Sequence, residues 1–97
     1  MTAPAAPVTL DTTVVCSTQV LVQDVGGEAV LLDLASEQYF GLDQVGSRVW
    51  ALFGVSGHLG TVHARMCEEF DADPARIQQD LLVLTRDLAK AGLVSVT

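Results

Sequence analysis

The chain has 97 residues, of which 49% are hydrophobic and 18% are charged, and its formal net charge is −7 at pH 7. A chain of this length builds one hydrophobic core and leaves no room for a deep active-site cleft, so we expect a single folded domain. The negative charge opposes binding to the phosphates of nucleic acids and to anionic membranes, and we predict neither partner. The charge is also uneven, because residues 1–42 hold five acidic side chains and no Lys or Arg.

Residues 1–9 contain Pro4 and Pro7 among several alanines, which predicts a flexible tail outside the core, so that the domain spans 10–97. The tail lacks the positive region and apolar stretch of a signal peptide, and no apolar run reaches the ~20 residues that span a membrane. The two cysteines, Cys16 and Cys67, match neither a disulfide framework nor a metal-binding spacing. We interpret both as small buried hydrophobic residues of a cytoplasmic protein that uses no cofactor.

Residues 10–42 form the predicted strand region. It begins at Val14 and Val15 and continues through segment 19–25, which is rich in β-branched residues. The pair Gly26 and Gly27 indicates a two-residue hairpin turn. The returning segment 28–34 is apolar on both faces for much of its length, which is typical of a strand covered on two sides.

A turn at 35–37 leads into the short aromatic segment 38–42, which predicts a third strand. Period-two alternation places Phe40 and Leu42 on one face of this strand, and Tyr39 and Gly41 on the other.

Residues 43–92 are predicted to be helical. Asp43 is a good N-cap for a first helix that ends at Gly54. The apolar residues of this helix recur at helical spacing: Val45, Val49, Leu52 and Phe53. A glycine-rich loop at 55–60 precedes a second helix, for which Thr61 is the expected cap. Its expected buried positions are Val62, Met66 and Phe70.

A third helix is predicted to start at Asp73, because Pro74 then occupies the first helical position, and to end at Gly92. Its expected inner face consists of Ile77, Leu81, Leu84 and Leu88. Residues 93–96 follow as a short apolar tail that packs back on the body.

Three strands followed by three helices predict an α+β fold, a winged helix-turn-helix with a three-stranded antiparallel sheet. This architecture is common among DNA-binding proteins, and a DNA-binding regulator is one alternative function. The third helix, however, carries only Arg76, Arg86 and Lys90 against Asp80 and Asp87. A DNA reader needs more phosphate-neutralising side chains around that helix, so the charge argues against DNA binding.

The chain offers no catalytic constellation. His63 and Cys67 are four residues apart on one helix face, but two ligands without a second cluster do not make a metal site. Asp71 and Asp73 flank the start of the third helix, where turn and capping roles explain them. We therefore predict a protein that is not an enzyme and holds no metal.

Binding is the function that the strand region supports. Edge strands are normally protected by Lys, Pro or bulges, and segment 38–42 has none of these. If it is an edge, its backbone can pair with an extended peptide, with a face of the third helix as the opposite wall. The predicted binding residues are Gln38, Tyr39, Phe40, Gly41 and Leu42 on the strand, and Arg76, Gln79, Asp80, Val83 and Asp87 on the helix. In the alternative interpretation, Tyr39 and Val83 only fill a local core. An unprotected edge can also pair with its own copy, so a homodimer is a further possibility.

Several segments, in this order and spacing, resemble the PqqD-like family: 27–33, 39–50, 61–62, 80–84 with Leu88, and 92–94. Its members are small winged-helix domains that recognise the leader segment of ribosomally made peptides destined for modification. The resemblance implies that the leader adds as a strand to segment 38–42, against helix 74–91. Where the family commonly has Leu-Asn before the first helix, this chain has Leu42-Asp43, and Asp caps a helix equally well.

Within the family, the stand-alone leader-recognition proteins of lasso-peptide pathways are more similar to this chain than the member that serves pyrroloquinoline quinone synthesis. The resemblance then implies a chaperone that captures a precursor and hands it to a leader peptidase, before a cyclase closes the ring. Besides the DNA-binding regulator, a third function stays open, namely an accessory domain that scaffolds an enzyme and binds no peptide.

Overall fold

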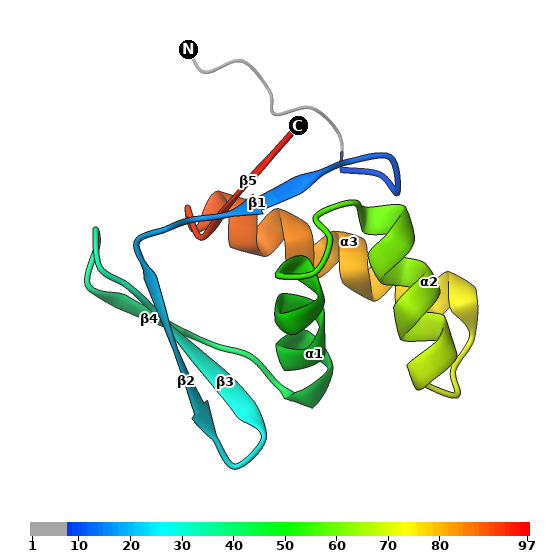
Figure 1. Cartoon of the computed structure of the whole chain (residues 1–97), viewed down its shortest axis with the longest axis horizontal. Coiled ribbons are helices and arrows are strands. Elements are labelled where there is room, and N and C mark those ends of the chain that lie inside the picture. The colour runs from blue at the N-terminus through cyan, green and yellow to red at the C-terminus, as the bar shows by residue number, and fades with distance from the viewer. Residues whose placement is uncertain (1–7) are drawn as a thin grey trace.

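The computed structural model describes residues 8–97, which form an α+β fold (Figure 1). In chain order its elements are β1 (Val14–Cys16), β2 (Val20–Val25), β3 (Glu28–Asp33), β4 (Gln38–Gly41), α1 (Gln44–Phe53), α2 (Leu59–Glu69), α3 (Pro74–Lys90) and β5 (Val94–Val96). The three-stranded antiparallel sheet and the three helices that follow it confirm the predicted winged helix-turn-helix class.

Strands β2, β3 and β4 pair in that order and form the wing (Figure 1). Both central residues of the β2–β3 turn have positive φ angles, 66° at Gly26 and 88° at Gly27. Two-residue hairpin turns require this backbone conformation, which glycine adopts more readily than residues with a side chain. The predicted hairpin is therefore confirmed. The β3–β4 turn contains Glu37 at φ 58°, and the Asp33 carboxylate accepts hydrogen bonds from Ala35 N and Ser36 Oγ at 3.1 and 2.8 Å.

A second sheet was not expected from the sequence. Strand β1 does not join the wing but pairs antiparallel with β5, with Val14 opposite Val96 and Cys16 opposite Val94. The C-terminal residues predicted as an apolar tail thus form a strand. The two partners lie about 80 positions apart in the chain, and no local pattern reports such a pairing.

The predicted boundary between the tail at 1–9 and the folded domain is wrong, because residues 8 and 9 belong to the folded part. Val8 is only 6% exposed and belongs to the core, and Thr9 N donates to Thr12 Oγ1 at 2.9 Å. The remaining part of the predicted tail, 1–7, lies outside the described residues.

The caps confirm two predicted helix starts and correct one. Asp43 accepts a hydrogen bond from Gly46 N at 2.7 Å, and Asp73 accepts one from Ala75 N at 2.9 Å. Helix α2, however, starts at Leu59, with His58 rather than Thr61 as its cap. The reason is tertiary, because Leu59 N donates to Thr12 O at 3.0 Å, which holds the start of α2 against the N-terminal segment.

The core lies between the three helices, with β3 of the wing on one side and the β1–β5 sheet on another. Three predicted core positions differ. Val45 is 43% exposed, and Phe70 and Leu84 are only partly covered. Thr85 takes a fully buried place instead, since its hydroxyl donates to Leu81 O at 2.8 Å and needs no other partner.

Candidate peptide-binding site

Strand β4 is an edge of the wing sheet, which is the condition on which the predicted peptide site depends. Leu42 N donates to Ala29 O at 2.8 Å, which marks these two residues as a hydrogen-bonded pair of the antiparallel ladder. Because such pairs alternate along a ladder, Phe40 and Gln38 also direct their backbone groups toward β3. The N–H and C=O groups of Tyr39 and Gly41 therefore point to the open side.

The ladder stops where β4 runs into α1. There the Ser47 hydroxyl replaces a direct strand–strand bond, accepting from Ala29 N at 2.7 Å and donating to Leu42 O at 3.4 Å. Together with the Asp43 cap, this bridge fixes the position of β4 relative to the first turn of α1.

The side chains of β4 divide as the alternation predicted. Leu42 is buried and Phe40 is half-buried on the face toward the helices, whereas Tyr39 is 72% exposed on the other face. Val83 of α3 is also exposed, at 45%. The alternative in which Tyr39 and Val83 fill a local core is therefore wrong.

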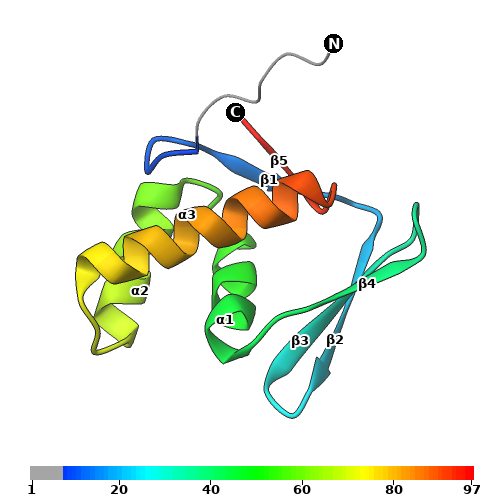
Figure 2. The ribbon, with the colours of Figure 1, turned by 180° about the vertical axis from the view of Figure 1, so that it is seen from behind.

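A pocket of about 410 Å³ lies between α1 and the α2–α3 hairpin, and α3 crosses α1 beside it (Figure 2). Its lining is mainly apolar and consists of Val45, Val49, Met66, Phe70, Ala72, Asp73, Arg76, Ile77, Asp80, Leu81 and Leu84. The charged lining residues all belong to the N-cap or the first two turns of α3, and two of them, Asp73 and Asp80, are acidic whereas one, Arg76, is basic. The pocket can thus take an apolar side chain with a polar or basic neighbour.

The pocket is lined by some of the predicted helix residues but by none of the predicted strand residues. None of the residues 38–42 lines it, whereas exposed Val45, in the first turn of α1 shortly after β4, does. The open edge of β4, Val45 and the pocket are the three parts of the path that we propose below for a peptide.

The predicted residues of α3 separate into two groups. Arg76 and Asp80 line the pocket, with Arg76 Nε 3.8 Å from Asp80 Oδ2. Asp87 follows Asp80 by seven positions, which keeps it on the same exposed face, next to Val83. Gln79 instead lines a shallow hollow on the opposite flank of α3, with Ala75, Gln78, Leu82 and Arg86.

Of the pocket lining, sequence reasoning found only Arg76 and Asp80. Among the residues that it missed are Val45 and Leu84, because it assigned both to the core stripe. Helical spacing alone places them correctly near that stripe but does not reveal which side neighbouring elements leave open. The sequence held one signal for each of them: Val45 follows the edge strand closely, and Leu84 lies one helical turn after Asp80.

A bidentate ion pair between Arg48 of α1 and Glu69 of α2 joins these two helices. Arg48 Nε and Nη2 donate to the two carboxylate oxygens of Glu69 at 2.5 and 2.7 Å. The hydrogen bond from Arg48 keeps the pKa of Glu69 below its ordinary value. The stabilisation from the ion pair is therefore fully present when the pH is above the ordinary pKa of Glu, and it is lost as the pH falls through the lowered pKa of Glu69.

In the part of the chain that the structure describes, no three potential metal ligands among the His, Cys, Asp and Glu side chains come together. Both cysteines are half-buried rather than fully buried. Burial raises the pKa of the Cys16 thiol, which keeps it protonated. His63 Nε2 lies 2.8 Å from Pro74 O and 3.5 Å from Cys67 Sγ, so it joins α2 to the start of α3. No helix within residues 8–97 has the length and apolar character needed to cross a membrane.

Comparisons with known proteins show the family of this chain. A family model described as coenzyme PQQ synthesis protein D (PqqD) matches residues 28–94, from the start of β3 into β5. The chain belongs to the PqqD family. A solved structure titled "TbiB1 in Complex with the TbiA(beta) Leader Peptide" is similar to it, with 34% sequence identity and a TM-score of 0.77. The likeness covers 82% of this chain and 93% of that chain. No curated protein matches the chain.

Proposed function

We propose that this chain binds the leader segment of a ribosomally made precursor peptide, which adds as a strand to β4. The observation that carries the proposal is the open edge, where the N–H and C=O groups of Tyr39 and Gly41 have no partner strand within residues 8–97. Membership of the PqqD family and the similarity to TbiB1, whose structure contains a leader peptide, support it.

The path beyond the edge supplies selectivity. The apolar pocket accepts an apolar leader side chain, while Asp80 and Asp87 favour polar or basic leader positions along α3. Net contributions of about 1 kcal/mol per hydrogen bond and about 25 cal/mol per Å² of apolar burial make micromolar to nanomolar binding attainable for a short segment. Gln79 is not part of this proposal, because it lies on the other flank of α3.

In this role the chain performs no chemistry itself. It captures the precursor in the cytoplasm, where such peptides are made, and delivers it to modifying enzymes, a leader peptidase and then a cyclase. A lasso-peptide pathway is the assignment that the sequence resemblance favours.

The open edge is tested at Gly41. In Gly41→Pro the outward-pointing N–H is lost, and we expect the Kd for the leader to rise about 10- to 100-fold, since a hydrogen bond is lost and the pyrrolidine ring faces the incoming strand. Gly41→Ala is the matched control, because a Cβ at this position meets no atom within 4 Å and the N–H remains. Fluorescence anisotropy with a labelled leader peptide measures both constants.

A second control uses the other edge of the wing. By the same alternation, Val22 directs its N–H away from β3, so Val22→Pro removes an equivalent donor from β2. We expect it to bind the leader with unchanged affinity. Equal loss of affinity in the Gly41→Pro and Val22→Pro variants would show that the leader does not pair with β4.

Fluorescence anisotropy titrations also test the two alternative functions, the DNA-binding regulator and the accessory domain that binds no peptide. DNA binding is not favoured by α3, where Arg76 lies beside Asp80 rather than free for a phosphate. Any DNA affinity should fall steeply with salt, whereas strand addition should not. Binding of the leader by the purified chain without another protein would exclude the accessory domain that binds no peptide.

A further inference from the structure

The wing has one face toward α1 and a second face that no helix or strand of residues 8–97 covers (Figures 1 and 2). Leu31 of β3 is fully buried toward α1, so its neighbour Leu32 points to the opposite face. The register places Leu21 of β2 and Tyr39 of β4 on either side of Leu32. We call this surface the outer face; its apolar residues are Leu21, Val25, Val30, Leu32, Leu34 and Tyr39.

The outer face is too apolar for a surface that only meets water. Four of its six apolar residues are widely exposed: Leu21 at 55%, Val25 at 57%, Leu34 at 46% and Tyr39 at 72%. Leu21 and Val25 lie on β2, Tyr39 lies on β4, and Leu34 follows β3 at the start of the β3–β4 turn. The partly covered Leu32 of β3 lies between Leu21 and Tyr39, so these residues form one patch. Contiguous exposed apolar patches of this kind mark protein interaction sites. The sequence predicted that β3 is covered on two sides, and within residues 8–97 the chain covers only one.

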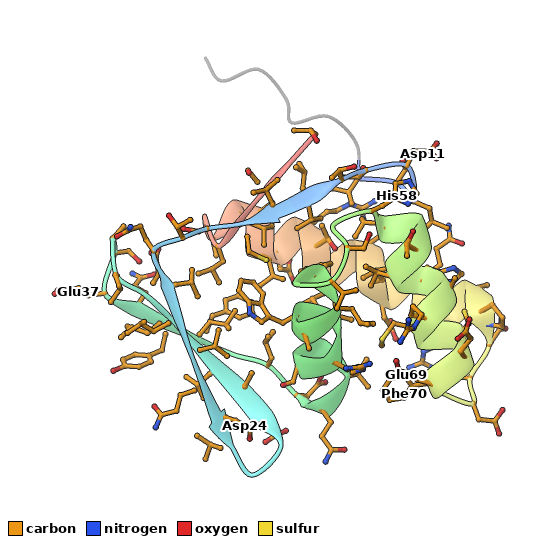
Figure 3. The ribbon with its side chains drawn as sticks, viewed as in Figure 1. Asp11, Asp24, Glu37, His58, Glu69 and Phe70 are labelled. Atoms are coloured by element: carbon orange, nitrogen blue, oxygen red, sulfur yellow. The ribbon has the colours of Figure 1, made fainter. Side chains whose placement is uncertain are left out.

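The charges around the outer face decide what covers it. Glu28 lies opposite Val25 at the hairpin end, and Glu37 lies in the β3–β4 turn at the other end of the wing (Figure 3). No Lys or Arg occurs before Arg48 to balance them. Two copies packed through this face would bring acidic side chains together, so a second copy is disfavoured. The complementary partner is a different protein with an apolar centre and a rim of Lys and Arg.

The outer face also adjoins the leader. A strand added to β4 places alternate side chains on the outer face, beside Tyr39 and Gly41. A protein that packs on this face therefore contacts the chain and the bound leader at once. We propose that the outer face docks the enzyme that acts on the leader, a protein with an apolar, basic-rimmed surface. This inference rests on the proposed function and adds the surface used for delivery.

The test compares two double variants that bind the same leader. Leu21→Gln/Leu34→Gln removes two apolar side chains from the outer face. Val15→Gln/Val22→Gln removes two apolar strand residues of similar exposure, 56% and 51%, outside it, since Val15 belongs to β1 and Val22 to the opposite face of β2. None of the four residues lies on the proposed leader path. The probe is the purified leader peptidase that cleaves the precursor whose leader this chain binds, together with that precursor peptide.

We expect both variants to bind the leader within twofold of the wild-type Kd. The Kd for the peptidase, measured by calorimetry with and without leader, should rise at least tenfold in Leu21→Gln/Leu34→Gln and stay unchanged in Val15→Gln/Val22→Gln. Precursor cleavage at limiting peptidase should fall in parallel. Equal peptidase affinity for the two variants would overturn the proposal.

Two further outcomes are distinguished in the same samples. A wild-type dimer in sedimentation equilibrium that Leu21→Gln/Leu34→Gln converts to a monomer would overturn the proposal in favour of a second copy. A wild-type chain that binds the peptidase but not the leader would contradict the proposed function while leaving the docking surface supported.

Discussion

Replacing Gly57 by alanine is expected to destabilise the domain by about 3 kcal/mol or more. A Cβ at this position would lie 2.1 Å from Val14 O, a backbone atom that cannot rotate away. Val14 N donates to Gly57 O at 2.8 Å, and Val14 is paired with Val96 of β5. Moving Val14 to make room therefore breaks this hydrogen bond and disturbs the β1–β5 sheet. Urea denaturation measured by circular dichroism gives the change in free energy of unfolding.

Gly41→Ala is the control for this experiment, because the added methyl group meets open space. We expect a change below about 1 kcal/mol, as for other exposed substitutions. A Gly57→Ala variant as stable as Gly41→Ala would mean that the loop before α2 does not pack on β1 in solution.

The second large effect is expected at Leu31, whose substitution by alanine should cost about 2–5 kcal/mol of unfolding free energy. The Leu31 side chain is fully buried, lies opposite Phe40 and belongs to the core that joins the wing to α1. Its removal leaves a cavity at the contact that holds the wing against the helices. The same denaturation experiment measures the loss, and leader titration below the transition reports whether the remaining folded protein keeps its site.

Leu32→Ala is the matched control, since Leu32 is the next residue of the same strand but points to the outer face. It is only partly covered, and we expect its substitution to cost less than about 1.5 kcal/mol. Equal losses at Leu31 and Leu32 would contradict the assignment of β3 to one buried and one open face.

The fold class and most element boundaries could be predicted because their signals are local. The Gly26–Gly27 turn, the Asp43 cap and the Asp73–Pro74 helix start each act over two to four residues, and the structure confirms all three. The cap of α2 could not be predicted in this way. His58 precedes the helix because Thr12 O accepts a hydrogen bond from Leu59 N, a contact between segments 47 positions apart.

The site divides along the same line. Alternation within 38–42 correctly separated exposed Tyr39 from covered Phe40 and Leu42, since side-chain direction in a strand depends only on position. Helical spacing could not separate the two flanks of α3. Gln79 and Asp80 are sequence neighbours, but the pocket that α1 and α2 also line lies on only one flank of α3, so Asp80 lines the pocket and Gln79 lies across the helix.

By itself, the sequence determined an acidic α+β winged helix with an unprotected third strand. Composition, turn residues and periodicity are sufficient for these statements, because each depends on neighbouring residues. Only the tertiary structure decided that β4 is an edge, that Tyr39 and Gly41 present the free backbone groups, and that Val45 and Leu84 line the pocket. It also decided that β1 pairs with β5 and that the outer face stays open within residues 8–97. These features depend on which distant segments meet, and that choice is made by the packing of the whole chain.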